Sequence, residues 1–312
     1  MLDANSSFAL YLKIVNKAQL SLVAAAIGAT LIIFFLGKTV PSDKGTKSSP
    51  AAGSAMQGMQ AERISFEELL ALSKKRLSPS LLQQIELKEK ELSGLADSAQ
   101  KIAAYRNLAR LWMDSVGVFV PFAKYTAEAA KLENSEKNLN FAAQLLLEEA
   151  LSVQEKPLKA WMATEARDLF EQHLRVRPNN DSAKIGLGSC YFFGAAKEGE
   201  PPMKGVLLIR DIAEKHPENA YAQRMLGIGA AESGQKDKAV ERFQNVYRLE
   251  PDNMEVLLRL ANINEQSGDK KEAKRWYEEL LKVVKRLEKE SKFKPGPEMI
   301  RQLEEHIKTL EN

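Results

Sequence analysis

The chain has 312 residues, of which 44% are hydrophobic, 28% charged and 7% aromatic. This composition excludes a disordered, a collagen-like or a polytopic membrane protein. The net charge of +3 is carried by residues 1–60, so residues 61–312 hold equal numbers of acidic and basic groups. That balance argues against nucleic acid as the partner.

From position 18 to position 36 the chain carries no charged side chain. As a helix this stretch would span about 28 Å, close to the roughly 30 Å of a bilayer's hydrocarbon core. We therefore expect a tail over residues 1–17 and a transmembrane helix over 18–37. A cleaved signal peptide is disfavoured because its apolar region is usually about 7–15 residues long.

The flanks of this segment bear on its orientation. The lysines on the two sides are nearly balanced, but short N-terminal tails usually stay in the cytoplasm. We expect the body on the periplasmic side of the cell (inner) membrane, with the cytoplasmic side left open. Residues 38–63 are rich in Ser, Gly, Ala, Pro and Lys, which predicts a flexible linker.

The body, residues 64–312, is expected to be helical. Ser65-Phe66-Glu67-Glu68 has the form of a capping box, and Ser78-Pro79 places a serine cap before a proline at the first helical position. Further helices are expected over 97–115, 119–132 and 135–154.

Two consecutive windows, 220–253 and 254–285, overlay on each other at a constant offset. The coinciding positions are Leu226 with Leu260, Gly234 with Gly268, Ala239 with Ala273, and Phe243 with Tyr277. This spacing and these residue types resemble the tetratricopeptide repeat, a unit of two helices and about 34 residues. Upstream, Pro178 and Pro217 are each expected to end a helix, as Pro251 is, and the interval between them is slightly longer than one repeat. The surplus residues of that longer repeat fall in 195–202.

The resemblance implies an all-α, right-handed helical solenoid with one N-terminal transmembrane helix and a C-terminal capping helix over 297–310. Confident repeats cover 181–285, and 135–180 forms a further repeat. Residues 65–132 are paired helices with diverged motifs. The residues expected to pack the repeats are Leu226, Gly227, Ala239, Phe243, Pro251, Leu260, Ala273 and Tyr277.

In this family the first helices of the repeats line a concave groove that commonly binds peptide segments. Positions carried over to this chain are Ser182, Ile185, Ser189, Phe192, Tyr221, Arg224, Ile228, Glu255, Arg259, Asn262 and Glu265. Some relatives clamp a C-terminal carboxylate there. Arg259 fits that pattern, but Met225 and Ser189 depart from it, which argues against this specificity.

The sequence shows no phosphate-binding or nucleophile motif. Its single cysteine, Cys190, excludes an intrachain disulfide and is expected to be a small buried hydrophobe. The histidines are widely separated, so we expect no catalytic residue, cofactor or metal. The three tryptophans, Trp112, Trp161 and Trp276, are expected in the core.

These observations favour a non-enzymatic, membrane-anchored scaffold that binds partner proteins in its groove and the bilayer through residues 18–37. The chain resembles anchored tetratricopeptide repeat proteins of Gram-negative inner membranes. A structural subunit of a larger membrane complex is the alternative. An enzyme with its active site in residues 65–175 is less favoured.

Overall fold

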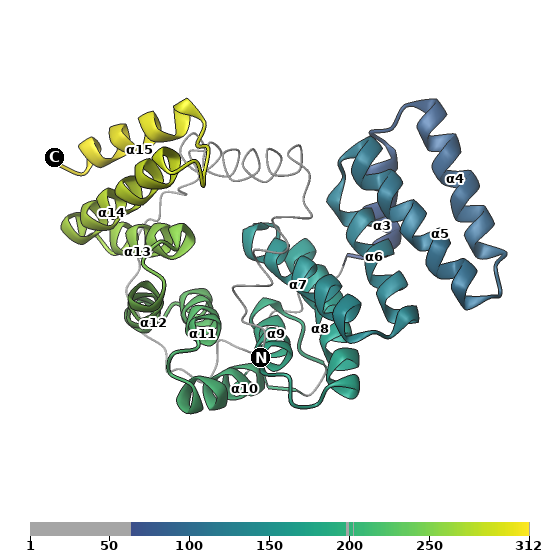
Figure 1. Ribbon diagram of the computed structural model, residues 1–312, viewed down its shortest axis with the longest axis horizontal. Coiled ribbons are helices and arrows are strands. Elements are labelled where there is room, and N and C mark those ends of the chain that lie inside the picture. The colour runs from purple at the N-terminus through teal and green to yellow at the C-terminus, as the bar shows by residue number, and fades with distance from the viewer. Residues whose placement is uncertain (1–63, 198–199, 202, 312) are drawn as a thin grey trace, which may run out of the picture. The chain divides into compact units, whose positions relative to one another are not determined.

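A computed structural model describes residues 64–197, 200–201 and 203–311, and within these residues the secondary structure is entirely helical. The α-helices are α3 (Phe66–Lys74), α4 (Pro79–Ser93), α5 (Ser98–Leu111), α6 (Phe119–Glu133), α7 (Glu136–Ser152), α8 (Lys156–Val176), α9 (Asp181–Cys190), α10 (Met203–Lys215), α11 (Ala220–Glu232), α12 (Lys236–Leu249), α13 (Met254–Gln266), α14 (Lys270–Lys289) and α15 (Pro297–Thr309) (Figure 1). The all-α class and the helical repeats expected from the sequence are confirmed.

The start of each repeat is set by an asparagine cap. Asn180, Asn219 and Asn253 stand two positions after a proline, and each side-chain oxygen accepts a hydrogen bond from the backbone N–H three positions on. The Ser65 capping box and the Ser78 cap are also present. The asparagine caps satisfy orphan N–H groups at the first turns of α9, α11 and α13.

The described residues fall into two compact units, 64–242 and 243–311, with the boundary inside α12. In the N-terminal unit the hairpins α5/α6, α7/α8 and α9/α10 pack in chain order. In the C-terminal unit α13 packs on α14, and α14 packs on α15.

A separate core lies beneath α4, α5 and α6. It contains Ile85, Leu108, Trp112 and Tyr125, and both Ile85 and Trp112 are fully buried. Trp112 begins a π-helical turn, Trp112–Val116, where the sequence predicts that the α-helix continues to residue 115. Gly117 ends this turn with φ +69°, a conformation that glycine adopts without strain.

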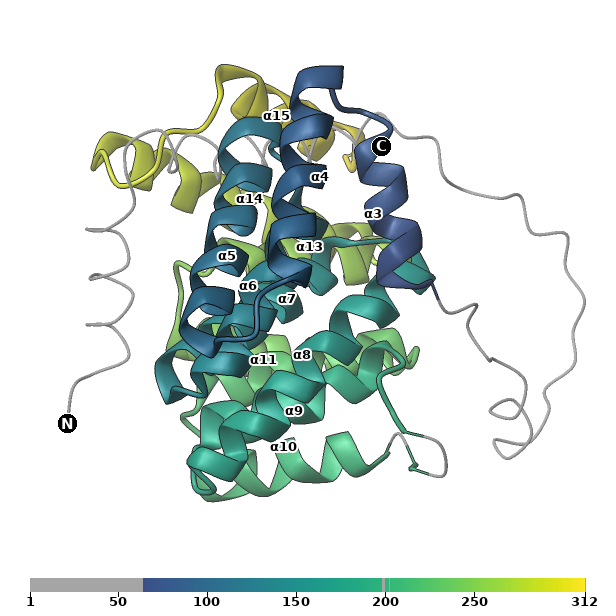
Figure 2. The same ribbon diagram turned by 90° about the vertical axis from the view of Figure 1, so that its right-hand side faces the viewer.

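The helices α9 and α10 lie side by side and contact each other (Figure 2). A Cβ on Gly188 would lie 2.7 Å from the Gly205 carbonyl oxygen, and a Cβ on Gly205 would lie closer still to the Gly188 oxygen. The sequence places Gly205 where the repeat pattern has alanine. The close backbone contact explains why glycine replaces alanine at this position, because no side chain fits between the two helices here.

Seven of the eight expected repeat-packing residues are buried. Phe243, Ala239, Leu260, Ala273 and Tyr277 are fully buried. Leu226 is 8% exposed, Gly227 is also buried, and Pro251 lies at the surface just after α12. The capping helix α15 buries Leu303, Ile307 and Leu310. The buried residues among these form the packed interior that the repeat pattern predicts.

Within the described residues, no helix is both long and apolar enough to cross a bilayer. The transmembrane helix expected over 18–37, together with the tail and linker on either side of it, lies outside these residues.

His173 on α8 is a buried polar side chain. It is 1% exposed, and within the described chain neither ring nitrogen has a hydrogen-bond partner. Burial lowers the pKa of the imidazole, Glu136 opposes that shift, and Arg177 adds to it. The folded protein therefore favours neutral His173, whereas the unfolded chain protonates it below about pH 6.5.

The contribution of neutral His173 to stability is thus complete above about pH 6.5 and falls as the pH drops toward the lowered pKa. We expect His173→Leu to raise the free energy of unfolding by about 1–2 kcal/mol at pH 7 by removing two unpaired polar atoms. The difference should widen at pH 5.5 in urea titrations. His216→Gln, at an exposed histidine, should leave the pH dependence unchanged. An equal loss on acidification in His173→Leu and the parent would contradict this.

Candidate functional site

Groups that could carry chemistry are sparse in the described residues. No cluster of three His, Cys, Asp or Glu side chains there could hold a metal ion. Cys190 is fully buried, its Sγ donates to the Gly186 carbonyl at 3.2 Å, and burial raises the pKa of its thiol. Cys190 is therefore an unreactive packing residue, as the sequence predicts.

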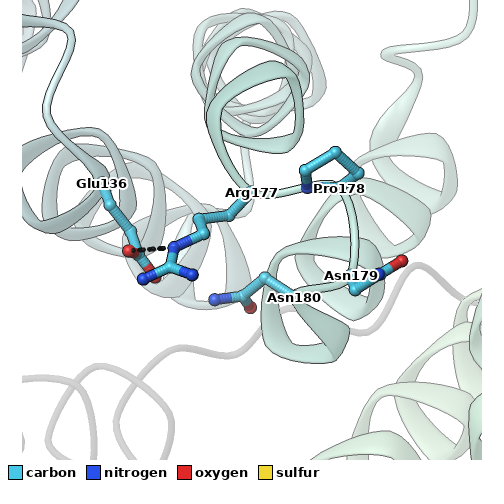
Figure 3. A pocket seen from close by; sticks show the side chains of 5 residues that line it. All are labelled: Glu136, Arg177, Pro178, Asn179 and Asn180. Atoms are coloured by element: carbon cyan, nitrogen blue, oxygen red, sulfur yellow. Dashed lines mark hydrogen bonds and ion pairs between the residues drawn. The ribbon is translucent and has the colours of Figure 1, made fainter.

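Two surface hollows lie in the N-terminal unit. Figure 3 shows one of about 270 Å³ at the turn Pro178-Asn179-Asn180, where Arg177 Nε donates to Glu136 Oε2 at 2.8 Å. The other, about 400 Å³, lies among α4, α5 and α6. Its lining residues are Glu89, Leu92, Ser93, Lys101, Tyr105, Glu128 and Leu132. The first is the turn that joins two repeats, and its ion pair is exposed to solvent.

Three of the expected groove residues are wrongly assigned, because the structure buries them. Ile185 and Ser189 on α9 are fully buried, and Ile228 on α11 is 1% exposed. The Ser189 hydroxyl donates to the Ile185 carbonyl at 2.8 Å within its own helix. These side chains pack the interior and cannot contact a partner in this conformation.

The buried residues of α9 lie between the helices that pack on its two sides. Both α7 and α11 contact α9, and their side chains meet each other. Tyr221 Oη donates to Gln144 at 3.2 Å, and Arg224 Nη2 donates to Glu148 at 2.6 Å. The Arg224 guanidinium also lies over the Tyr221 ring. We call the two hydrogen bonds the α7–α11 bridge.

Of the remaining expected groove residues in this unit, Ser182 is exposed and Phe192 is half-buried. The Phe192 ring fills the space that a Cβ on Gly229 would occupy. The Arg224 side chain is only 15% exposed. The groove positions of the N-terminal unit are therefore mostly engaged inside the protein.

Gln144 and Glu148 were not among the expected residues. They stand on one face of α7 four positions apart, a spacing that brings side chains together on a helix. That regularity could have indicated them. The weak repeat pattern of 135–154 gave no register by which to assign them.

If the bridge closes this face, removing Arg224 should expose Ser189. In a Cys190→Ser chain carrying Ser189→Cys, we expect Arg224→Ala to increase the rate of thiol labelling about tenfold. A tenfold change corresponds to roughly 1.4 kcal/mol, the upper end of the net contribution of an ordinary hydrogen bond, as suits a pair in which Glu148 is 46% exposed. The matched control, Glu232→Ala, breaks the Lys159–Glu232 pair between α8 and α11. Equal labelling in all three chains would mean that packing alone closes the face.

The expected groove residues of the C-terminal unit, in contrast, are accessible to solvent. Glu255, Arg259, Asn262 and Glu265 follow one face of α13 and are all partly exposed. Arg259 Nε donates to Glu255 at 2.8 Å, and its guanidinium lies 6.0 Å from the centre of the Phe243 ring. We call these four residues the α13 polar face.

The C-terminal end of the α13 polar face is held by two neighbouring helices. Tyr277 Oη of α14 donates to Asn262 at 2.7 Å and to Glu265 at 2.8 Å. The His306 ring of α15 lies 3.0 Å from the same Glu265 carboxylate. Burial and the hydrogen bond to Glu265 raise the pKa of Tyr277, so the hydroxyl stays protonated and keeps donating.

Comparison with known proteins gives matches of limited extent. Residues 230–285 match the family described as tetratricopeptide repeat. The cyclic dipyrimidine nucleotide synthase CdnE of Cecembia lonarensis is 27% identical over 127 residues. That stretch is 40% of this chain and 40% of CdnE, so the chain spans less than half the length of this relative.

Among solved structures, a crystal structure of MamA is 15% identical with a TM-score of 0.38. The match covers 60% of this chain and 94% of that one. MamA from Desulfovibrio magneticus RS-1 is 19% identical with a TM-score of 0.36, covering 62% and 96%. YrrB, described as a TPR protein with an unusual peptide-binding site, is 18% identical with a TM-score of 0.34, covering 58% and 84%.

Two further observations agree with the family match: the constant repeat spacing and the burial of the repeat positions within α12, α13 and α14. Residues 230–285 are therefore a tetratricopeptide repeat segment.

Proposed function

We propose that the protein is a non-enzymatic scaffold that binds segments of partner proteins along the α13 polar face. The α13 polar face supports this proposal most strongly. It lies inside the matched repeat region, runs for about 15 Å along the helix, and presents charged and amide groups that remain partly exposed. Such a row can form charge-assisted hydrogen bonds with an extended segment.

The expected groove positions on α9 are not part of the proposed site. Ile185 and Ser189 are buried, and the α7–α11 bridge joins the two helices that contact α9 on either side. The proposed site is therefore formed by Glu255, Arg259, Asn262 and Glu265 of α13.

The proposal includes membrane anchoring through residues 18–37, which would raise the local concentration of the scaffold at the bilayer. We place the body on the periplasmic side of the inner membrane. Protease treatment of intact spheroplasts tests this placement, since a periplasmic body should be digested without lysis. Digestion only after lysis would place it in the cytoplasm.

Site-specific photo-crosslinking in cells tests the binding itself. A photoreactive residue at Arg259 should give a reproducible, saturable protein adduct, whereas the same group at Glu241, exposed on α12, should not. The same adduct from both positions, or none from Arg259, would contradict the proposed site. Co-purification of one stoichiometric partner in mild detergent, without crosslinking, would instead favour a fixed subunit of a larger complex.

The synthase activity named for CdnE is not carried over, because the alignment covers 40% of that protein.

A further inference from the structure

The helix α14 carries its positive charge on one side. Residues 270–294 hold ten basic and five acidic side chains, although the whole body is neutral. At about 100° per residue, six basic residues lie within roughly 60° of one line along the helix, where the only acidic residue is Glu278. These six, which we call the α14 basic stripe, are Lys271, Arg275, Lys282, Lys285, Arg286 and Lys289.

The α14 basic stripe faces away from the core. All six residues are exposed, and the side chains of Lys282 and Arg275 are 69% and 59% accessible. The opposite side of the helix buries Ala273, Tyr277, Leu280 and Val284. Packing therefore fixes the direction in which the stripe points, and its length is about 27 Å from Lys271 to Lys289.

Four members of the stripe have acidic neighbours. Arg275 pairs with Glu272, Lys282 with Glu279, Lys285 with Glu304, and Arg286 with Asp252. Exposed pairs of this kind are weak and exchange readily. With Glu304 and Asp252 added to the count, the ten basic groups of residues 270–294 still outnumber seven acidic groups, which favours a positive potential along the stripe.

We propose that the α14 basic stripe docks the C-terminal unit on the headgroups of anionic phospholipids. This inference rests on the membrane anchoring proposed above. A linker of the composition of residues 38–63 would have an end-to-end distance of about 30 Å, and with the proposed anchor it would hold the body near the bilayer surface. At that distance, clustered basic side chains are attracted to an anionic surface without a defined pocket.

Lipid fits the stripe better than nucleic acid does. The body carries no net charge, so it offers little long-range attraction to a free polyanion. A bilayer surface within a tether's reach does not require such attraction.

The experiment is an amine-acetylation footprint, read by mass spectrometry, of the full chain reconstituted into vesicles. One preparation contains phosphatidylcholine alone, and the other also contains phosphatidylglycerol. We expect Lys271, Lys282 and Lys289 to react roughly three- to tenfold more slowly on the anionic vesicles. High salt should remove the difference, because it screens attraction between exposed charges. Three exposed lysines elsewhere, Lys75, Lys90 and Lys137, serve as internal controls that should not change.

In a Lys271→Glu, Lys282→Glu, Lys289→Glu variant, Lys285 is the one lysine of the stripe that remains. Anionic vesicles should no longer slow its acetylation. Equal reactivity on both vesicles, or equal protection of the controls, would overturn the proposal. So would a duplex oligonucleotide that protects the stripe more strongly than anionic lipid does. If alkaline carbonate extracts the chain from the vesicles, the anchoring has failed. In that case, acetylation of the extracted chain with the same vesicles added tests lipid binding by the stripe separately from the anchoring. Crosslinking at Arg259 reports on partner binding independently of either result.

Discussion

Replacing Phe243 with alanine is expected to lower the free energy of unfolding by about 3–5 kcal/mol, the range for deleting a buried aromatic ring. Phe243 is fully buried in α12, and the Arg259 guanidinium lies over its ring. The substitution should therefore leave a cavity and also loosen Arg259 on the α13 polar face. Urea unfolding followed by circular dichroism measures the loss.

Leu249→Ala is the matched control for this change, because Leu249 lies on the same helix and is 42% exposed. It should cost well under about 1 kcal/mol, as surface truncations usually do. Similar unfolding midpoints for the two variants would show that Phe243 does not hold the repeats together.

Gly205→Ala is expected to destabilise the protein by about 1–3 kcal/mol, although alanine is intrinsically the better helix former by about 1 kcal/mol. The added methyl group would meet the Gly188 carbonyl and the Tyr191 Cβ. A backbone oxygen cannot rotate away as the end of a side chain can. The helices α9 and α10 must therefore separate.

Gly94→Ala makes the same change without the clash. Gly94 has φ −86° at the end of α4, and the nearest atom to an added Cβ is 3.6 Å away. It should be neutral or slightly stabilising. If Gly205→Ala proved equally harmless in thermal unfolding, the close approach of α9 and α10 would be wrong.

The repeat architecture could be predicted because its determinants are local and periodic. Ala239 and Ala273 occupy the same position in consecutive repeats, and each is fully buried. Each asparagine cap stands two positions after a proline, so its position can be recognised in the sequence. Such units stack because each helical hairpin buries one apolar face against the next hairpin.

The state of the groove could not be predicted, because it depends on contacts between helices distant in the sequence. Arg224 and Glu148 are 76 residues apart, and only the packing of both helices on α9 brings them together. Family positions alone indicated that Ser189 would be accessible. The α7–α11 bridge, which joins the helices on the two sides of α9, is not part of the repeat pattern.

Tyr277 shows the same limit in another way. Its position predicts a buried aromatic side chain, and the ring is buried. Its hydroxyl, which donates to two expected groove residues, carries no periodic signal in the sequence. The π-helical turn at Trp112–Val116 also lacks a local signal, since those residues continue the helical pattern before them.

Thiol labelling of single cysteines in a Cys190→Ser chain most directly tests whether these hairpins pack at the repeat positions and leave α13 open. Ala239→Cys and Ala273→Cys place a thiol at two fully buried crossings, and Arg259→Cys places one on the α13 polar face. The first two should react only after urea is added, and the third should react at once. Rapid labelling of Ala239→Cys and Ala273→Cys in the native protein, or protection of Arg259→Cys, would contradict the account.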